Sequence, residues 1–297
     1  MVTRKDLGPQ PLVVVGAEDP EALRIQEVIT EENLPFVYAR YRGERVDPRT
    51  AYLFDTPSDI SPCSSIVLVE CFPAPKTLSS IKRSIDNKTN YTNFFVIDHH
   101  REGDPGFAAP AAKSWAASSL GQLCTLLDRA PDKRDLAMAA MDHNFAAALR
   151  GEVPNVTPQE VLELYLNEIT EHTNTPRKEL EELVTNYRQI IVASKSIRLT
   201  QDHSLARGSV RDMRDIDIGL LYSDRYLTAK LALLLERTSA ILTTRNSDDP
   251  NESEKIILMG EASPDCVCSF INEFAAREGL SEIYGSAARG YAGGYKS

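Results

Sequence analysis

Three short apolar segments constrain the fold of this chain more than any other feature of its sequence. They cover residues 12–15, 65–72 and 93–97, and apolar residues do not alternate with polar ones in the second and third. Strands of this composition are typically buried on both faces, as in a parallel sheet with helical crossovers. Helical apolar spacing follows the first segment in 22–29 and returns in 133–149. We therefore predict an α/β fold with a parallel sheet and flanking helices.

A second, smaller α/β domain is predicted in the C-terminal third. Its strands are expected at 215–222, 240–245 and 255–260, and its helices at 226–237 and 268–277. The charged, amphipathic segment 157–197 is typical of two or three surface helices. The polar stretches 77–86 and 246–253 are expected to form a helix and an exposed loop. The predicted domains are 1–199, which includes the helical segment, and 200–297.

The composition limits the environment and the partners. With 33 basic and 43 acidic residues, the formal charge is -10. This charge argues against long duplex DNA or an anionic membrane surface as a partner. Five cysteines, an odd number, favour reduced thiols in a cytoplasmic protein. No segment approaches the roughly 18 apolar residues of a membrane span.

Asp98, His99 and His100 are the most informative residues, because they directly follow the apolar segment 93–97. In open α/β sheets, the loops beyond the carboxyl ends of the strands form the ligand crevice. A carboxylate beside two imidazoles combines oxygen and nitrogen donors, a mixture that suits manganese, iron or zinc. The plainer interpretation of the three residues is a polar strand end with capping roles.

Acidic residues also follow the other predicted strands. Asp19 and Glu21 come after the first strand and Glu70 after the second, while Asp142 lies in the helical segment 133–149. If the strands lie side by side, these acids converge with the histidine pair at one edge. Such an arrangement can hold two cations roughly 3.5–4 Å apart, which together clamp both oxygens of an in-line attack on phosphorus.

These residues resemble the motifs of the DHH phosphoesterases, a family that includes RecJ-type exonucleases, small-oligonucleotide and cyclic-dinucleotide phosphodiesterases, and a class of inorganic pyrophosphatases. Residues 96–100, Val-Ile-Asp-His-His, look like the family signature, and 19–21, 117–124 and 136–142 resemble motifs around it. The resemblance implies metal ligands at Asp19, Glu21, Glu70, Asp98, His99 and Asp142. It implies catalytic roles for Asp98, His99 and His100.

In this family resemblance, Asp98 is either a ligand or an orienter of the histidines, and His100 helps to bind the scissile phosphate. Two Mn²⁺ ions are implied, with Mg²⁺ as the alternative ion.

His143 directly follows Asp142, but the next residue of a helix points about 100° away. We therefore expect His143 to lie beside the ligands rather than among them.

The glycine-rich tail, residues 284–295, resembles the loop that ends the smaller domain of the family and binds substrate. Glycines in such a loop expose backbone N–H groups to an anion, and an arginine can grip phosphate with two bonds. Tyr291 and Tyr295 could stack on a base. The residues that the resemblance assigns to substrate binding are His100, Arg101, Arg289, Gly290, Tyr291, Gly293 and Gly294. The plainer interpretation is a frayed glycine-rich terminus.

The resemblance implies a hydrolase, a metal-dependent phosphodiesterase that cleaves short single-stranded oligonucleotides or cyclic or linear dinucleotides with two-metal-activated water. The alternative is a non-catalytic nucleotide- or protein-binding module with a degenerate site. It is favoured by glutamate where the family has aspartate, at Glu21 and Glu70, and by the lack of a histidine in 15–17 and in the tail. Association into a homodimer is left open.

Cys266 and Cys268 lack a second cysteine pair or a nearby histidine, so we expect buried thiols there rather than a zinc site. The glycines form no G-x-G-x-x-G fingerprint, so a nicotinamide or flavin cofactor has no support.

Overall fold

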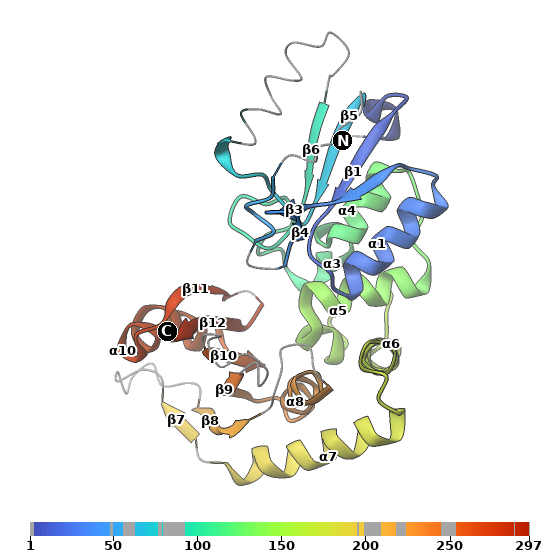
Figure 1. Cartoon of the computed structure of the whole chain (residues 1–297). Coiled ribbons are helices and arrows are strands. Elements are labelled where there is room, and N and C mark those ends of the chain that lie inside the picture. Colours follow the sequence, from blue (N-terminus) through green and yellow to red (C-terminus); the bar gives the residue numbers. More distant parts are fainter. Residues whose placement is uncertain are drawn as a thin grey trace. The chain divides into compact units, whose positions relative to one another are not determined.

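The computed structural model divides the chain into two compact units, Met1–Val156 and Thr157–Ser297, both drawn in Figure 1. It describes residues 3–47, 50–55, 63–76, 79, 93–194, 196–198, 209–217, 224–244, 254–287 and 289–296. The expected loop at 246–253 lies outside these ranges, as does the expected helix at 77–86 except for Ser79.

A four-stranded parallel sheet forms the centre of the first unit. Its strands lie in the order β2 (Phe36–Tyr38), β1 (Pro11–Val15), β5 (Ser65–Val69) and β6 (Asn93–Ile97). Every residue of β1 and β5 is buried, which explains why neither segment alternates apolar with polar residues. The predicted α/β fold with a parallel sheet is confirmed.

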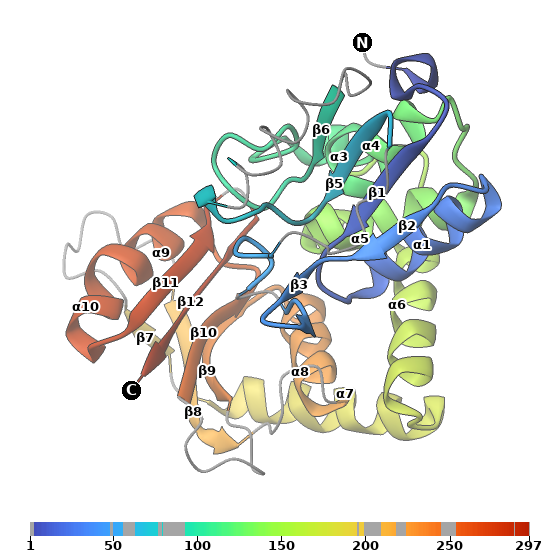
Figure 2. The same ribbon diagram turned by 45° about the horizontal axis from the view of Figure 1, so that its top comes forward.

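The register of this sheet places three strand ends at one edge. Val15 of β1 pairs with Val69 of β5, and Val69 pairs with Ile97 of β6. The residues that follow these three strands therefore leave the sheet side by side. This alignment is visible in Figure 2, where β1, β5 and β6 run together.

Helices cover one face of the sheet and irregular chain covers the other. The remaining elements of this unit are η1 (Arg4–Leu7), α1 (Pro20–Glu31), β3 (Arg40–Tyr41), β4 (Glu44–Arg45), η2 (Ala111–Lys113), α3 (Ser114–Ala117), α4 (Ser119–Leu126) and α5 (Lys133–Leu149). Helix α1 packs against α4 and α5. On the other face, Leu12, Val14 and Leu68 pack in one apolar cluster with Phe54.

The second unit contains a six-stranded mixed sheet. Its strands lie in the order β11 (Ser281–Ser286), β12 (Tyr291–Lys296), β10 (Glu254–Gly260), β9 (Ser239–Thr244), β8 (Ser209–Asp217) and β7 (Ser196–Arg198). Its helices are α6 (Pro158–Thr173), α7 (Arg177–Ala193), α8 (Asp224–Leu235), α9 (Pro264–Ser269), the π-helical turn η3 (Phe270–Phe274) and α10 (Ala275–Glu278). Phe270 and Phe274 pack on the buried side of β9 and β10.

The boundary between the units differs from the expected one at 199/200, because α6 and α7 belong to the second unit. Helix α7 packs along α8. The Tyr165 hydroxyl on α6 donates a hydrogen bond to the Leu227 carbonyl of α8 at 2.9 Å, and Arg188 on α7 pairs with Glu236 at 2.5 Å. The buried residues of α7, which packs along α8, are Leu180, Val184, Tyr187 and Ile191.

Within the ranges that the structure describes, no helix is both long and apolar enough to cross a membrane. All five cysteines are free thiols, and Cys266 is buried as expected. Cys268 is exposed, so the expectation of a buried thiol is wrong at that position.

Candidate metal centre

The loop after β1 delivers two acids to the edge where the strands end. Asp19 is the N-cap of α1 and accepts a hydrogen bond from the Ala22 amide at 2.7 Å, with Pro20 in the first turn. Glu21 follows on the first turn of α1 and is 1% exposed. Its Oε1 accepts a hydrogen bond from the Leu120 amide at 2.9 Å, which fixes the carboxylate in the interior.

Glu70 reaches the same edge through an unusual backbone conformation. It follows β5 with a φ of 52°, in the left-handed region that a residue with a Cβ seldom adopts. Its amide donates to the Ile97 carbonyl at 3.0 Å. Gly16 makes room, because a Cβ there would lie 2.2 Å from the Glu70 carbonyl oxygen. Strained conformations of this kind persist where the surrounding structure holds a functional side chain in place.

His99 lies at the centre of the acids and is fully buried. Its Nε2 is 2.9 Å from Asp142 Oδ2, 3.7 Å from Glu21 Oε2 and 3.8 Å from Glu70 Oε1. Three predicted site residues, from α1, α5 and the end of β5, thus meet around one nitrogen atom of His99, which follows β6. The expected convergence of acids and histidine at the sheet edge is present in the structure.

Asp98 serves as an orienter of the histidines. Its Oδ1 accepts hydrogen bonds from the His99 amide at 2.7 Å, the His100 amide at 3.0 Å and His100 Nδ1 at 2.9 Å. Its Oδ2 accepts the Tyr52 hydroxyl at 3.0 Å. Burial alone would raise the pKa of Asp98, but the hydrogen bonds and charge of His100 hold it below its ordinary value. With both oxygens occupied, Asp98 positions His100 instead of facing the acids.

Tyr52 and Arg101 form a second layer beside Asp98. The Arg101 guanidinium carbon lies 3.2 Å from the centre of the Tyr52 ring, a close cation–π contact. Burial, followed by the charge of Asp98, raises the pKa of Tyr52, so its hydroxyl keeps its proton and donates. Tyr52 was missed by the sequence interpretation, because it is 46 residues from Asp98 and lies in no recognisable motif.

Tyr52→Phe tests this contact with the smallest change of shape. Loss of the hydroxyl leaves Asp98 Oδ2 without its donor, so we expect the free energy of unfolding to fall by about 0.5–1.5 kcal/mol. Urea unfolding measures this difference, and Tyr41→Phe on β3 is the matched loss of a hydroxyl. Equal stability of Tyr52→Phe and the wild type would show that the contact contributes nothing.

Burial and mutual repulsion raise the pKa values of the acids around His99. Burial, then the charge of Asp142, raises the pKa of Glu21 well above its ordinary value. Burial likewise raises the pKa of Glu70, with Asp19 and Glu21 adding to the effect. Burial and Asp142 raise the pKa of Asp19 to about 6. Without a cation, therefore, these carboxylates cannot all be ionised at low cost.

The donor set fits a divalent cation. Two groups of side chains could each hold a metal ion. In each group every residue offers one ligand atom, and these atoms lie within 4.8 Å of one another. The groups are Glu21 with His99 and Asp142, and Glu70 with His99 and His100. Glu21 Oε2 and Glu70 Oε1 are buried and accept no hydrogen bond from the described residues. Buried polar atoms of this kind usually have a partner, and a cation would supply one. Carboxylate and imidazole donors together suit Mn²⁺, Mg²⁺ or Zn²⁺.

The glycine-rich tail forms a strand, so the expectation of an exposed loop is wrong for Tyr291–Lys296. This strand, β12, lies between β10 and β11, where its backbone groups pair with neighbouring strands and cannot cradle an anion. Gly293 is needed for packing, because a Cβ there would lie 2.2 Å from the Tyr284 hydroxyl. Of the tail residues assigned to substrate binding, Arg289 and Gly290 lie in a turn.

An aromatic surface takes the place of that loop. Tyr291, Gly293 and Tyr295 alternate onto one face of β12. Lys255 Nζ lies 5.1 Å from the ring centre of Tyr284 and 5.6 Å from that of Tyr295, and the Arg289 guanidinium carbon lies 5.5 Å from the centre of the Tyr291 ring. The tyrosines expected to stack on a base therefore stand beside cationic side chains.

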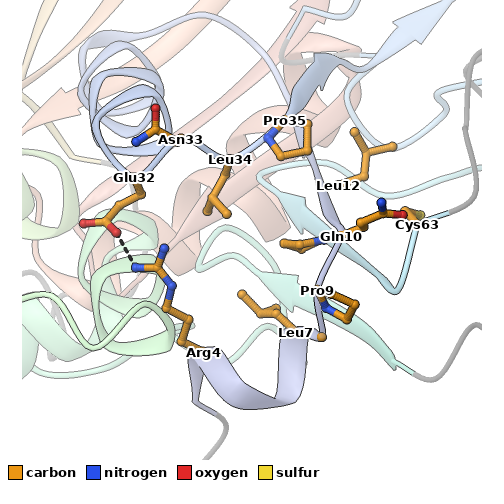
Figure 3. Close-up of a pocket in the computed structure, with 12 residues that line it drawn as sticks. Arg4, Leu7, Pro9, Gln10, Leu12, Glu32, Asn33, Leu34, Pro35 and Cys63 are labelled. Carbon is orange, nitrogen blue, oxygen red and sulfur yellow. Dashed lines mark hydrogen bonds and ion pairs between the residues drawn. The ribbon is translucent and has the colours of Figure 1, made fainter.

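A cavity of about 530 Å³ lies at the opposite edge of the first sheet. Figure 3 shows that it is lined by residues that precede strands, among them Gln10 before β1, Leu34 before β2 and Cys63 before β5. Arg4 and Glu32 form an ion pair at this cavity. Because the acids follow the carboxyl ends of the same strands, this cavity is separate from the metal centre.

Comparison with known proteins adds no family to this geometry. A scan against protein-family models found no match for the chain, and a search of curated proteins found none similar enough to match. The side chains at the sheet edge and the resemblance of residues 96–100 to the DHH signature are therefore the features that bear on function.

Proposed function

We propose that this protein is a metal-dependent phosphodiesterase that hydrolyses short single-stranded oligonucleotides or cyclic or linear dinucleotides. The observation that carries the proposal is the meeting of Glu21, Glu70 and Asp142 around the Nε2 atom of His99 at the carboxyl edge of a parallel sheet. Ligand sites of open α/β sheets lie at this edge. The resemblance of residues 96–100 to the DHH signature favours a phosphoester as the substrate.

Glu21, Glu70, His99 and Asp142 would hold the cation, Mn²⁺ or Mg²⁺. When bound, the cation supplies a Lewis acid for a phosphoryl oxygen and acidifies a water molecule. The protein supplies the placement of the ligands, because Leu120 fixes Glu21 and the backbone at Glu70 directs that side chain inward.

His100 and Arg101 would bind the phosphate. The His100 side chain is 31% exposed at the border of the buried acids, and its Nδ1 donates to Asp98, which fixes the direction of the ring. Arg101 is exposed and is held over the Tyr52 ring. Two cationic or hydrogen-bonding groups fixed in this way can stabilise charge that develops on phosphate oxygens.

The preference for short substrates follows from charge. A long polymer needs a compensating lysine or arginine for each phosphate that it presents, and the chain carries a formal charge of -10. Within the second unit, Tyr291 and Tyr295 share one face of β12 beside Arg289 and Lys255 and would offer aromatic rings to a nucleotide base. These aromatic side chains would have no role with inorganic pyrophosphate.

The second candidate function is a binding module that keeps the fold without turnover. It is favoured by the positions of Asp19 and Asp98, since Asp19 caps α1 and Asp98 is occupied by four donors. These two expected ligands therefore have other roles, which leaves fewer groups for a second cation. A centre with one cation could bind a nucleotide phosphate without holding a water molecule in line for attack on phosphorus.

The test uses the full chain with Mn²⁺ and measures release of mononucleotides from labelled di- to decanucleotides and from a cyclic dinucleotide, and release of phosphate from pyrophosphate. We expect Mn²⁺-dependent turnover of the shortest substrates, with Asp98→Ala reducing it because His100 loses its hydrogen-bond acceptor. Turnover of pyrophosphate alone would reject the nucleotide substrate. Absence of turnover with every substrate, together with tight binding of a dinucleotide, would establish the binding module.

A further inference from the structure

We infer that His143 is a positioning residue that fixes the protonation pattern of His99, so that His99 presents the bare Nε2 atom to a cation. The inference rests on the proposed metal site but concerns a residue that the resemblance does not place in it. His143 is fully buried, directly after Asp142 on α5.

The contacts of His143 define the direction of its hydrogen bonds. Its Nε2 lies 2.9 Å from the Ala109 carbonyl oxygen, and a carbonyl only accepts, so Nε2 carries the hydrogen atom. A neutral imidazole carries one N–H, which leaves a lone pair on His143 Nδ1. This Nδ1 is 3.1 Å from Nδ1 of His99.

With both rings neutral, the hydrogen bond between the two imidazoles runs in one direction. His99 Nδ1–H donates to His143 Nδ1, and the lone pair of a neutral His99 is on Nε2. Nε2 is the atom that lies 2.9–3.8 Å from the oxygens of Asp142, Glu21 and Glu70. Metal-binding histidines commonly donate their other ring N–H to an acceptor, which fixes the tautomer and the ring orientation. Here the acceptor is a second histidine, itself fixed by a backbone carbonyl.

A break in α5 makes this arrangement possible. Successive residues of a regular helix point about 100° apart, yet Asp142 and His143 contact opposite nitrogens of one ring. The helix is interrupted at Asn144, whose φ of -155° and ψ of 75° are not helical. The Asn144 side chain accepts from the Ala147 amide at 3.1 Å and so acts as an N-cap where the helix restarts.

Gly106 lets the covering loop close over His99. The Gly106 amide donates to the Asp98 carbonyl at 3.1 Å, three residues before Ala109. A Cβ at Gly106 would lie 1.9 Å from the Ala117 carbonyl oxygen and 2.7 Å from the Cβ of His99. The same loop therefore approaches His99 closely and supplies the carbonyl that orients His143.

Two substitutions separate positioning from packing. His143→Gln keeps an acceptor and a donor on one side chain, an oxygen for His99 Nδ1–H and an N–H for Ala109. His143→Leu fills a similar volume with neither group. We expect His143→Leu to lower the affinity for Mn²⁺ and Zn²⁺ about 10–100-fold, and His143→Gln to restore most of it. Calorimetric titration of the metal alone measures this.

The direct readout is the proton position on His99, from two-bond ¹H–¹⁵N NMR of the full chain labelled at histidine, without metal and with diamagnetic Zn²⁺. We expect His99 Nδ1 to be protonated in the wild type and in His143→Gln, and the pattern to change in His143→Leu. His99 protonated only at Nε2 in the metal-free wild type would overturn the inference, as would equal metal affinities of the two variants.

Failure of the proposed function is distinguishable from failure of this inference. If the wild type binds neither Mn²⁺ nor Zn²⁺, the metal site is rejected, while the NMR pattern of the metal-free wild type still decides the direction of the hydrogen bond. If His143→Leu does not fold, the wild type and His143→Gln carry the same test.

Discussion

Replacement of His99 with alanine is expected to abolish measurable Mn²⁺ binding and to lower turnover at least about 10²–10³-fold, the scale for loss of one group that stabilises transition-state charge. His99 Nε2 is the one atom within 4 Å of oxygens from Glu21, Glu70 and Asp142 among the described contacts. Without it, the carboxylates of Glu21, Glu70 and Asp142 lose the nitrogen donor that lies among them.

His172→Ala is the matched control, because His172 is exposed on α6 and belongs to the other unit. Calorimetric titration with Mn²⁺ and the mononucleotide assay are run on both variants. We expect the control to match the wild type in both. An unchanged Mn²⁺ affinity in His99→Ala would place the cation elsewhere and reject the centre proposed here.

The sheet of the first unit was predictable because its strands are buried on both faces. Apolar runs such as Pro11–Val15 and Ser65–Val69 leave little choice except a parallel sheet with helices. Once the strands are parallel neighbours, the residues after them share an edge. The grouping of Glu21, Glu70 and His99 follows from that rule, without knowledge of any distance.

The roles of individual acids within the group were not predictable. Asp98 and Glu21 are both carboxylates at strand ends, so the sequence does not tell their roles apart. Asp98 orients His100, and this role depends on Tyr52, which lies 46 residues away in the sequence and donates to Asp98. Asp19 was expected to bind metal but also caps α1. Such roles depend on which donors surround each oxygen, and tertiary contacts decide that.

The tail was misinterpreted because glycine has two opposite uses. A run containing Gly293 and Gly294 is typical of a loop, since glycine tolerates conformations that other residues avoid. In β12 the glycines have a packing reason instead, because the Tyr284 hydroxyl occupies the space above Gly293. The sequence signal that could have found this is the alternation of Tyr291, Gly293 and Tyr295, which has the period of a strand.

Glu70→Gln is expected to stabilise the metal-free protein at pH 8 and to remove its response to Mn²⁺. Burial and the charges of Asp19 and Glu21 raise the pKa of Glu70. A carboxyl whose pKa is raised by folding contributes stability below its unfolded pKa, and that contribution is lost as the pH rises through the folded pKa. Glutamine has nearly the same shape without the charge, so we expect a gain of about 0.5–2 kcal/mol in free energy of unfolding.

The pH dependence supplies the sign of the effect. Because the pKa of Asp19 is about 6 and that of Glu70 lies well above its ordinary 4.5, repulsion in the wild type grows from about pH 4.5 through pH 6 and beyond. The advantage of Glu70→Gln should therefore be absent near pH 4.5 and increase toward pH 8. Mn²⁺ at pH 8 should stabilise the wild type, since it offsets the same repulsion, and should leave Glu70→Gln unchanged.

Urea unfolding from pH 4.5 to 8, with a chelator or with Mn²⁺, measures both effects. Glu152→Gln is the matched control, because Glu152 is half exposed and pairs with Arg150 on the surface. It should gain no stability at pH 8 and should keep the Mn²⁺ response. A Glu70→Gln variant that is no more stable than Glu152→Gln at pH 8 would show that Glu70 is not held against other charges. If Mn²⁺ stabilises the Glu70→Gln variant as much as the wild type, the cation does not need Glu70. The electrostatic repulsion among the carboxylates would then have no part in metal binding.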